Sequence, residues 1–178
     1  MAESKDVFEA RENLHNREYF LKKIEENPNL IEWADEKIRN DKEIVLKAVS
    51  IDGGALEFAS DNLKDDKDVL LTATNQAGWT CCYASDRLKA DKDVLLTACK
   101  NDGQVLYFAS RELRDDKDVV LTAVSNKPII VKYASLRLRK DKDVAICAIS
   151  KAKKAVVEYF DENLINDDDI KALLDCNN

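Results

Sequence analysis

Apolar and polar positions along this chain follow a pattern that repeats every 25 residues. In the block that begins at Asp91, an acidic-basic-acidic triplet is followed by the apolar triplet Val94-Leu95-Leu96 and then by Ala98 and Cys99. Apolar residues at this spacing, behind an Asp that can cap free backbone N–H groups, predict an α-helix. The first helix of each block is expected to run from the Asp-Lys-Asp triplet to about the tenth residue.

The thirteenth position of each block predicts a break in the chain direction. It holds Pro28, Gly53, Gly78, Gly103 and Pro128. Gly permits a positive φ and Pro cannot continue a helix, so a second helix is expected to begin here. It carries an apolar pair and then an aromatic residue at the eighteenth position, which is Trp33, Phe58, Tyr83, Phe108, Tyr133 and the shifted Tyr159.

Small and aromatic residues at fixed positions indicate packing between neighbouring blocks. The aromatic stripe could suggest a cofactor site, but one aromatic per block, followed by Ala in the first five, is what stacked helices need in their core. The same core role is expected for the repeated Ala of the first helix, at Ala48, Ala73, Ala98, Ala123 and Ala148.

Short helices bury too little apolar surface alone, so the blocks are expected to stack into one domain. The pattern predicts an all-α fold: a right-handed α-solenoid of short antiparallel helix pairs over residues 1–178. One extra residue lies between Lys151 and Ala155. A capping helix is expected at Val7–Leu14, with Phe8 and Leu14 facing the stack. The expected parts are an N-terminal cap at 1–15, repeats at 16–40, 41–65, 66–90, 91–115, 116–140 and 141–166, and a half-repeat cap at 167–178.

Composition and charge narrow the classes of function. The chain is 45% hydrophobic and 35% charged, which favours an ordered protein, and its net charge of −7 argues against nucleic acid as a partner. No run reaches the ~18 apolar residues of a membrane span, and the N-terminus lacks the pattern of a standard signal peptide. A cytoplasmic location is expected.

The sequence offers little material for catalysis, and no catalytic residue, cofactor or metal is predicted. His15 is the only histidine, and no nucleophile motif accompanies it. The repeated Asp-Lys-Asp runs straight into a helix rather than into a calcium loop. With the basic residue near the end of each block, it predicts a mixed-charge edge between blocks. Five cysteines without CxxC spacing predict buried thiols rather than disulfides or zinc ligands, at Cys81, Cys82, Cys99, Cys147 and Cys176.

The motif Asp-Lys-Asp-Val-x-Leu-x-Ala, then Gly or Pro, then aromatic-Ala-Ser-x-x-Leu-Arg/Lys resembles a family of tandem helix pairs. That family is catalogued as domain of unknown function four-one-one-six and occurs in bacterial effector-like proteins and some protist proteins. The match is good over Asp41–Arg139 and looser in the flanking blocks. It implies the fold, carries no established site residues, and adds delivery into a host cytosol to the expected locations. A weaker resemblance is to variant leucine-rich repeats.

Function is expected where the blocks differ. Three positions of the second helix vary between blocks, namely the fourteenth, seventeenth and twenty-first, and their spacing predicts that they share one face of the helix. Large apolar or amphipathic groups there predict a partner-binding surface, made of Trp79, Cys82, Tyr107, Arg111, Ile129, Lys132 and Leu136. Trp79 has an alternative role, which is to cover Gly53 or Gly78.

The sequence therefore predicts a non-enzymatic repeat scaffold that binds another protein, with an effector-like role suggested by the resemblance. Two alternatives stay open. One is self-association through the patch of Trp79 and Tyr107. The other is a metal-dependent or hydrolytic enzyme built from irregular residues near Cys81 and Cys82 or from the C-terminal acids, Asp161 and Asp167 to Asp169.

Overall fold

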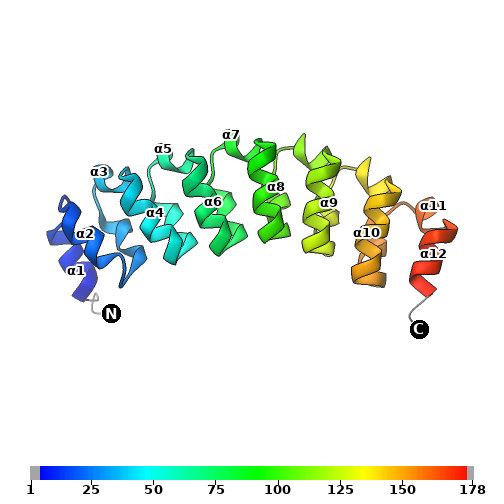
Figure 1. Cartoon of the computed structure of the whole chain (residues 1–178), viewed down its shortest axis with the longest axis horizontal. Coiled ribbons are helices and arrows are strands. Elements are labelled where there is room, and N and C mark those ends of the chain that lie inside the picture. Colours follow the sequence, from blue (N-terminus) through cyan, green and yellow to red (C-terminus); the bar gives the residue numbers. More distant parts are fainter. Residues whose placement is uncertain (1–4, 176–178) are drawn as a thin grey trace. The chain divides into compact units, whose positions relative to one another are not determined.

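The computed structural model describes residues 5–175, and these form helices and no strand. The all-α prediction is confirmed. The chain forms two compact units, Met1–Leu88 and Lys89–Asn178, which are treated separately below. Figure 1 shows the long α-helices of consecutive repeats standing side by side within each unit. The handedness of the solenoid and its organisation as one domain stay predictions.

The first unit contains the N-terminal cap and three repeats. Its helices are α1 (Lys5–Glu12), α2 (Arg17–Lys23), η1 (Pro28–Trp33), α3 (Glu36–Arg39), α4 (Lys42–Ile51), η2 (Gly53–Phe58), α5 (Asp61–Lys64), α6 (Lys67–Gln76), η3 (Gly78–Tyr83) and α7 (Asp86–Lys89), whose last residue opens the second unit. The label η marks a 3₁₀ helix.

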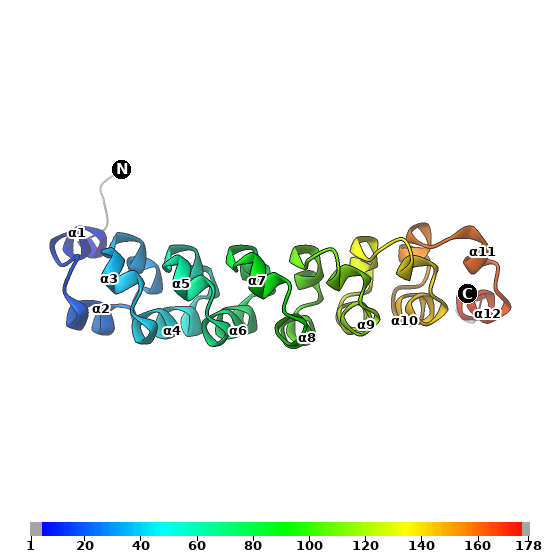
Figure 2. The same cartoon turned by 90° about the horizontal axis from the view of Figure 1, so that it is seen from above.

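The second unit contains the remaining repeats and the C-terminal helix. Its helices are α8 (Lys92–Asn101), η4 (Gly103–Phe108), η5 (Leu113–Asp115), α9 (Lys117–Asn126), η6 (Pro128–Tyr133), η7 (Leu138–Lys140), α10 (Lys142–Ala152), η8 (Lys153–Tyr159), α11 (Glu162–Ile165) and α12 (Asp168–Asp175). In Figure 2 the long α-helices of each unit lie in one layer and the short helices in another.

The first helix of each repeat forms as the sequence predicts. The Oδ1 atom of Asp66 accepts hydrogen bonds from the N–H groups of Asp68 and Val69, at 3.0 and 3.2 Å, and so caps α6. The repeated alanines are fully buried, as are the apolar residues that flank them. The extra residue is also confirmed, because α10 extends to Ala152 and Lys153 then turns with a φ of 49°.

The second helix is not one helix, which corrects the prediction. In the second repeat, η2 ends at Phe58, Ala59 is extended with a ψ of 155°, and Ser60 caps the separate short helix α5. The break allows the Ser60 N–H to donate to the Arg39 carbonyl of the preceding repeat at 2.9 Å. The aromatic-Ala-Ser motif therefore marks a turn that ties adjacent repeats together.

The glycines at the break do not adopt a positive φ, so the reason predicted for them is wrong. A Cβ on Gly53 would lie 2.5 Å from the Ala73 carbonyl oxygen, and a Cβ on Gly103 would overlap the Ala123 carbonyl oxygen. Real Cβ atoms do not approach backbone this closely. Glycine is therefore needed at these positions for the close packing of one repeat on the next.

Two packing predictions also need correction. The aromatic stripe is half-buried rather than in the core, and each ring stands on the last residue of a 3₁₀ helix, just before the chain turns. In α1, Ala10 is the buried residue, whereas Phe8 is 57% exposed and Leu14 is half-buried. Since α1 contacts η1 and its buried residue is Ala10, the exposed Phe8 does not pack into the stack.

A ladder of ion pairs joins the starts of the long helices. Lys42 Nζ lies 2.8 Å from Asp66 Oδ2 and 2.9 Å from Asp68 Oδ2 in the next repeat. Lys92, Lys117 and Lys142 each bridge to two acidic side chains in the same way. The Lys of each of these triplets thus builds the mixed-charge edge, and the two acids of the next triplet already have a cationic partner.

The ladder predicts a loss of stability in acid. Partial burial raises the pKa of Asp66, but hydrogen bonds from Lys42 and from the capped N–H groups lower it by more, so the net pKa is below its ordinary value. Asp116 and Asp141 behave in the same way. A depressed folded pKa contributes stability above the unfolded pKa of about 4, and this contribution is lost as the pH falls through the folded value.

We therefore expect the melting temperature, followed by circular dichroism, to fall as the pH drops below about 4. A variant with Lys42→Met and Lys117→Met should show a smaller fall, since the pKa of the facing carboxyls then returns towards its ordinary value. A melting temperature that rises between about pH 5 and pH 3 would contradict the assignment.

Candidate functional site

A groove between repeats is positioned by the serine of the aromatic-Ala-Ser turn. In the second unit, the Ser135 N–H donates to the Arg114 carbonyl at 2.9 Å, and its hydroxyl donates to Asp115. The Ser135 Oγ also accepts a hydrogen bond from the N–H of Leu138, the first residue of η7, at 3.1 Å. One serine therefore fixes the end of one repeat against the start of the next short helix.

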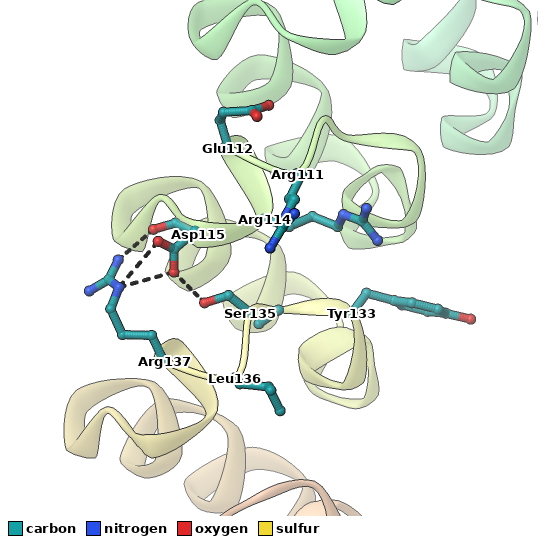
Figure 3. Close-up of a pocket in the computed structure, with 9 residues that line it drawn as sticks. Arg111, Glu112, Arg114, Asp115, Tyr133, Ser135, Leu136 and Arg137 are labelled. Carbon is teal, nitrogen blue, oxygen red and sulfur yellow. Dashed lines mark hydrogen bonds and ion pairs between the residues drawn. The ribbon is translucent and has the colours of Figure 1, made fainter.

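A cavity of the second unit opens beside this serine. Its volume is about 650 Å³, which lies in the range of small-ligand and peptide sites. We call it the Arg111 groove, and it is lined by Arg111, Glu112, Arg114, Asp115, Tyr133, Ala134, Ser135, Leu136 and Arg137. Figure 3 shows Arg114 on the side of Tyr133, and the Asp115–Arg137 pair on the opposite side.

Both carboxylates of the Arg111 groove are already engaged. Asp115 binds the Ser135 hydroxyl and Arg137 Nε at 3.0 Å, and these two contacts lower its pKa. A hydrogen bond from its own backbone N–H, another from the Ser110 hydroxyl, and the charges of Arg111 and Arg114 lower the pKa of Glu112. Neither acid makes an ion pair with Arg111 or Arg114 within the described residues.

The guanidinium groups of Arg111 and Arg114 therefore have hydrogen-bond donors that a ligand in the groove can use. Arg111 is exposed, and the Nε atom of Arg114 is buried without a hydrogen-bond partner. The Nε atoms of Arg39 and Arg139 share this property, so it belongs to the twenty-fourth position of the repeat. In the first unit, however, Arg39 pairs with Glu36 at 3.2 Å, whereas Arg114 has Arg111 at the equivalent position.

An aromatic and aliphatic patch continues from the Arg111 groove. The rings of Tyr107 and Tyr133 are 4.8 Å apart in an edge-on arrangement, and Tyr107 is 53% exposed. Leu136, which lines the groove, is 70% exposed. The Lys132 ammonium lies 5.0 Å from the centre of the Tyr133 ring. Four predicted residues of this unit, Tyr107, Arg111, Lys132 and Leu136, thus lie around one site, whereas Ile129 is half-buried.

The two remaining predicted residues belong to the first unit. Trp79 is 47% exposed and packs edge-on against Tyr83. A Cβ added to Gly54 would lie 3.4 Å from the Trp79 ring. The ring therefore lies beside a glycine, which is Gly54 rather than the predicted Gly53. Cys82 is half-buried. The shared face of one helix is not formed, since the twenty-first position follows the turn at the extended Ala.

The equivalent groove of the first unit has the opposite charge. Its cavity of about 240 Å³ is lined by three carboxylates and two cations, namely Glu36, Arg39, Glu57, Asp61 and Lys64, with Ala59, Ser60 and Asn62. Glu57 accepts a hydrogen bond from the Tyr83 hydroxyl at 2.8 Å, which raises the pKa of Tyr83 to about 12. In the second unit, Tyr107 takes the position of Glu57.

The C-terminal acids considered for metal or hydrolytic chemistry form ion pairs with lysines. Asp167 and Asp169 pair with Lys142 at 2.8 and 2.6 Å, and Asp161 pairs with Lys140 at 3.2 Å. Within residues 5–175, no three His, Cys, Asp or Glu side chains come together as a metal site.

The cysteines differ in their burial. Cys81 and Cys99 are buried, as predicted, whereas Cys147 is half-buried and lies 3.2 Å from the Ser125 hydroxyl. Cys176 lies outside the described residues. In the part of the chain that the structure describes, no helix has the length and apolar character needed to cross a membrane.

Two residues of the site were missed by sequence reasoning. Arg114 was assigned to a scaffold edge and Tyr133 to the core, because both positions repeat in type along the chain. A signal for the role of Arg114 lies three residues before it, at the twenty-first position of the repeat. This position holds an acid in the first three repeats, at Glu36, Asp61 and Asp86, but it holds Arg111 in the fourth.

Comparison with known proteins supports the repeat assignment. The model of the family described as Domain of unknown function (DUF4116) matches four stretches, at residues 16–64, 43–89, 66–114 and 116–165. Neither the curated proteins nor the solved structures gave a match. Since the matched stretches cover most of the chain, it belongs to this family of tandem helical repeats.

Proposed function

We propose that the chain is a non-enzymatic repeat scaffold that binds a segment of another protein through the surface around Tyr107, Tyr133 and Leu136. The observation that supports this most is the exposure of Tyr107 and Leu136 beside a 650 Å³ groove. Large rings and aliphatic groups at positions without packing duty are typical of interaction hot spots.

The repeated residues support the scaffold part of this proposal. The Asp of each triplet caps a helix, the Lys bridges two repeats, and the backbone N–H of the Ser donates to a carbonyl of the preceding repeat. These roles account for polar residues that might otherwise suggest chemistry. The residues with no such role, Tyr107 and Leu136, are the ones assigned to binding.

The test is selection of random peptides, displayed on phage, against the full chain. Peptides that bind the parent chain are expected to lose about 2 kcal/mol, or about thirtyfold in Kd, with Tyr107→Ala or Leu136→Ala. The same Kd should survive Ile51→Ala, a matched change at an exposed apolar residue of the first unit. Failure to select any peptide, or equal binding by all variants, would contradict the proposal.

Sedimentation of the chain without peptide separates binding of another protein from self-association. A chain that binds another protein should stay monomeric at the concentrations of the binding assay. A dimer that dissociates with Tyr107→Ala would instead place a second copy on this surface.

A further inference from the structure

The fourth and fifth repeats break a charge rule that the other repeats follow. In repeats one, two, three and six, the short helix after the turn is an α-helix that begins with an acid. These helices are α3, α5, α7 and α11, and they begin at Glu36, Asp61, Asp86 and Glu162, respectively. In the fourth and fifth repeats the equivalent residues are Arg111 and Leu136, and the turn is 3₁₀. An acid near a helix N-terminus favours the α-helix, so both departures act against the local fold.

The change at Arg111 also places two cations side by side, and the charge of Glu112 attracts both of them without a contact ion pair among the described residues. Arg111 and Arg114 lie three residues apart, where like charges repel, whereas Glu36 and Arg39 attract each other at the same positions. The acids that line the groove accept hydrogen bonds from Ser110, Ser135 and Arg137, and the charges of Arg111 and Arg114 also lower the pKa of Glu112. Within the described residues, neither Arg111 nor Arg114 forms an ion pair.

From these observations we infer that the Arg111 groove binds an acidic peptide segment, with a carboxylate side chain on Arg111 and Arg114 and a neighbouring apolar side chain on Tyr133 and Leu136. This deepens the proposed function and rests on it. An arginine fork matches carboxylate geometry, and charge-assisted hydrogen bonds are stronger than neutral ones. The partly desolvated position of Arg114 strengthens the attraction further.

The lining of the groove favours an acidic peptide over a nucleic acid. Two carboxylates, Glu112 and Asp115, lie among the three arginines, and they would repel the continuous phosphates of a nucleic acid. A peptide can place one acidic group between these carboxylates and turn an apolar group towards Leu136. The chain as a whole carries a net charge of −7, which disfavours a polyanion beyond this groove.

A direct test measures binding of the full chain to three polymers: a fluorescent random copolymer of glutamate and tyrosine, polyglutamate, and oligothymidylate. The parent chain should bind the copolymer most tightly. Arg111→Asp should weaken this binding by about tenfold or more, because it removes one cation and pairs the other. Arg111→Asp also restores the residue type of the other repeats, so its melting temperature should equal or exceed that of the parent.

Lys154→Asp is the matched control, because it makes the same change in charge at an exposed residue that does not line the groove. It should bind the copolymer as the parent does. The inference is overturned if the parent does not bind the copolymer or if oligothymidylate binds best. It is also overturned if Arg111→Asp binds the copolymer as tightly as the parent does, or if Lys154→Asp weakens binding as much as Arg111→Asp does. Display-selected peptides that need Tyr107 but ignore Arg111 would leave the proposed function standing and remove this inference.

Discussion

Replacing Leu106 by alanine is expected to lower the free energy of unfolding by about 2–5 kcal/mol. Leu106 is fully buried in η4, so the substitution removes apolar contacts and leaves a cavity that the neighbouring helices fill only in part. A repeat of this length depends on its neighbours for stability, so the loss should affect the whole unit. Urea unfolding followed by circular dichroism measures it.

Leu136→Ala provides the matched comparison, because it deletes the same atoms from a residue that is 70% exposed. The free energy of unfolding should then change by less than about 0.5 kcal/mol. Similar losses for the two variants would mean that Leu136 packs into the fold, and its assignment to the binding surface would fail.

The second large effect is expected for Gly103→Ala, which should cost about 1–3 kcal/mol of stability. The added Cβ would overlap the Ala123 carbonyl oxygen and lie 3.0 Å from Lys127 Cβ. The carbonyl belongs to the backbone of α9 and accepts a hydrogen bond from the Lys127 N–H, so it cannot move freely. The repeats must separate instead.

Gly54→Ala is the control for this effect. Its Cβ would meet the side chains of Asp52 and Trp79 at 3.0 and 3.4 Å, and side chains adjust more easily than backbone. It should therefore cost clearly less than Gly103→Ala in the same urea titration. Equal costs would mean that the backbone contact of Gly103 with the next repeat is not the cause of the loss, since the lower flexibility of the unfolded chain after Gly→Ala favours folding.

Helix starts could be predicted from the sequence because their causes are local. The Asp cap and the apolar spacing of the first helix lie within a few residues of each other, as in Asp66–Leu70. The break at Ala59 and Ser60 could not be predicted, since it depends on a hydrogen bond to Arg39 in the preceding repeat. Apolar residues three apart are compatible with both an α-helix and a 3₁₀ helix.

The site was predictable in part for a related reason. Tyr107, Arg111 and Leu136 depart from their equivalents in other repeats, and variation pointed to them. Arg114 and Tyr133 repeat in type, so they were assigned to the scaffold, yet their surroundings differ. The Arg39–Glu36 pair in the first unit shows that the role of a repeated arginine depends on the residue three positions before it. Comparing the charges at the twenty-first and twenty-fourth positions of each repeat would have identified this dependence from the sequence.

The most direct test of the account is to map binding by NMR on the ¹⁵N-labelled full chain. A display-selected peptide is titrated in, and the amide shifts are followed for each residue. The account predicts the largest shifts at residues 107–115 and 132–138, around the Arg111 groove. Largest shifts along α8 and α9, where the ion-pair ladder lies, would place binding on the scaffold residues and contradict the account.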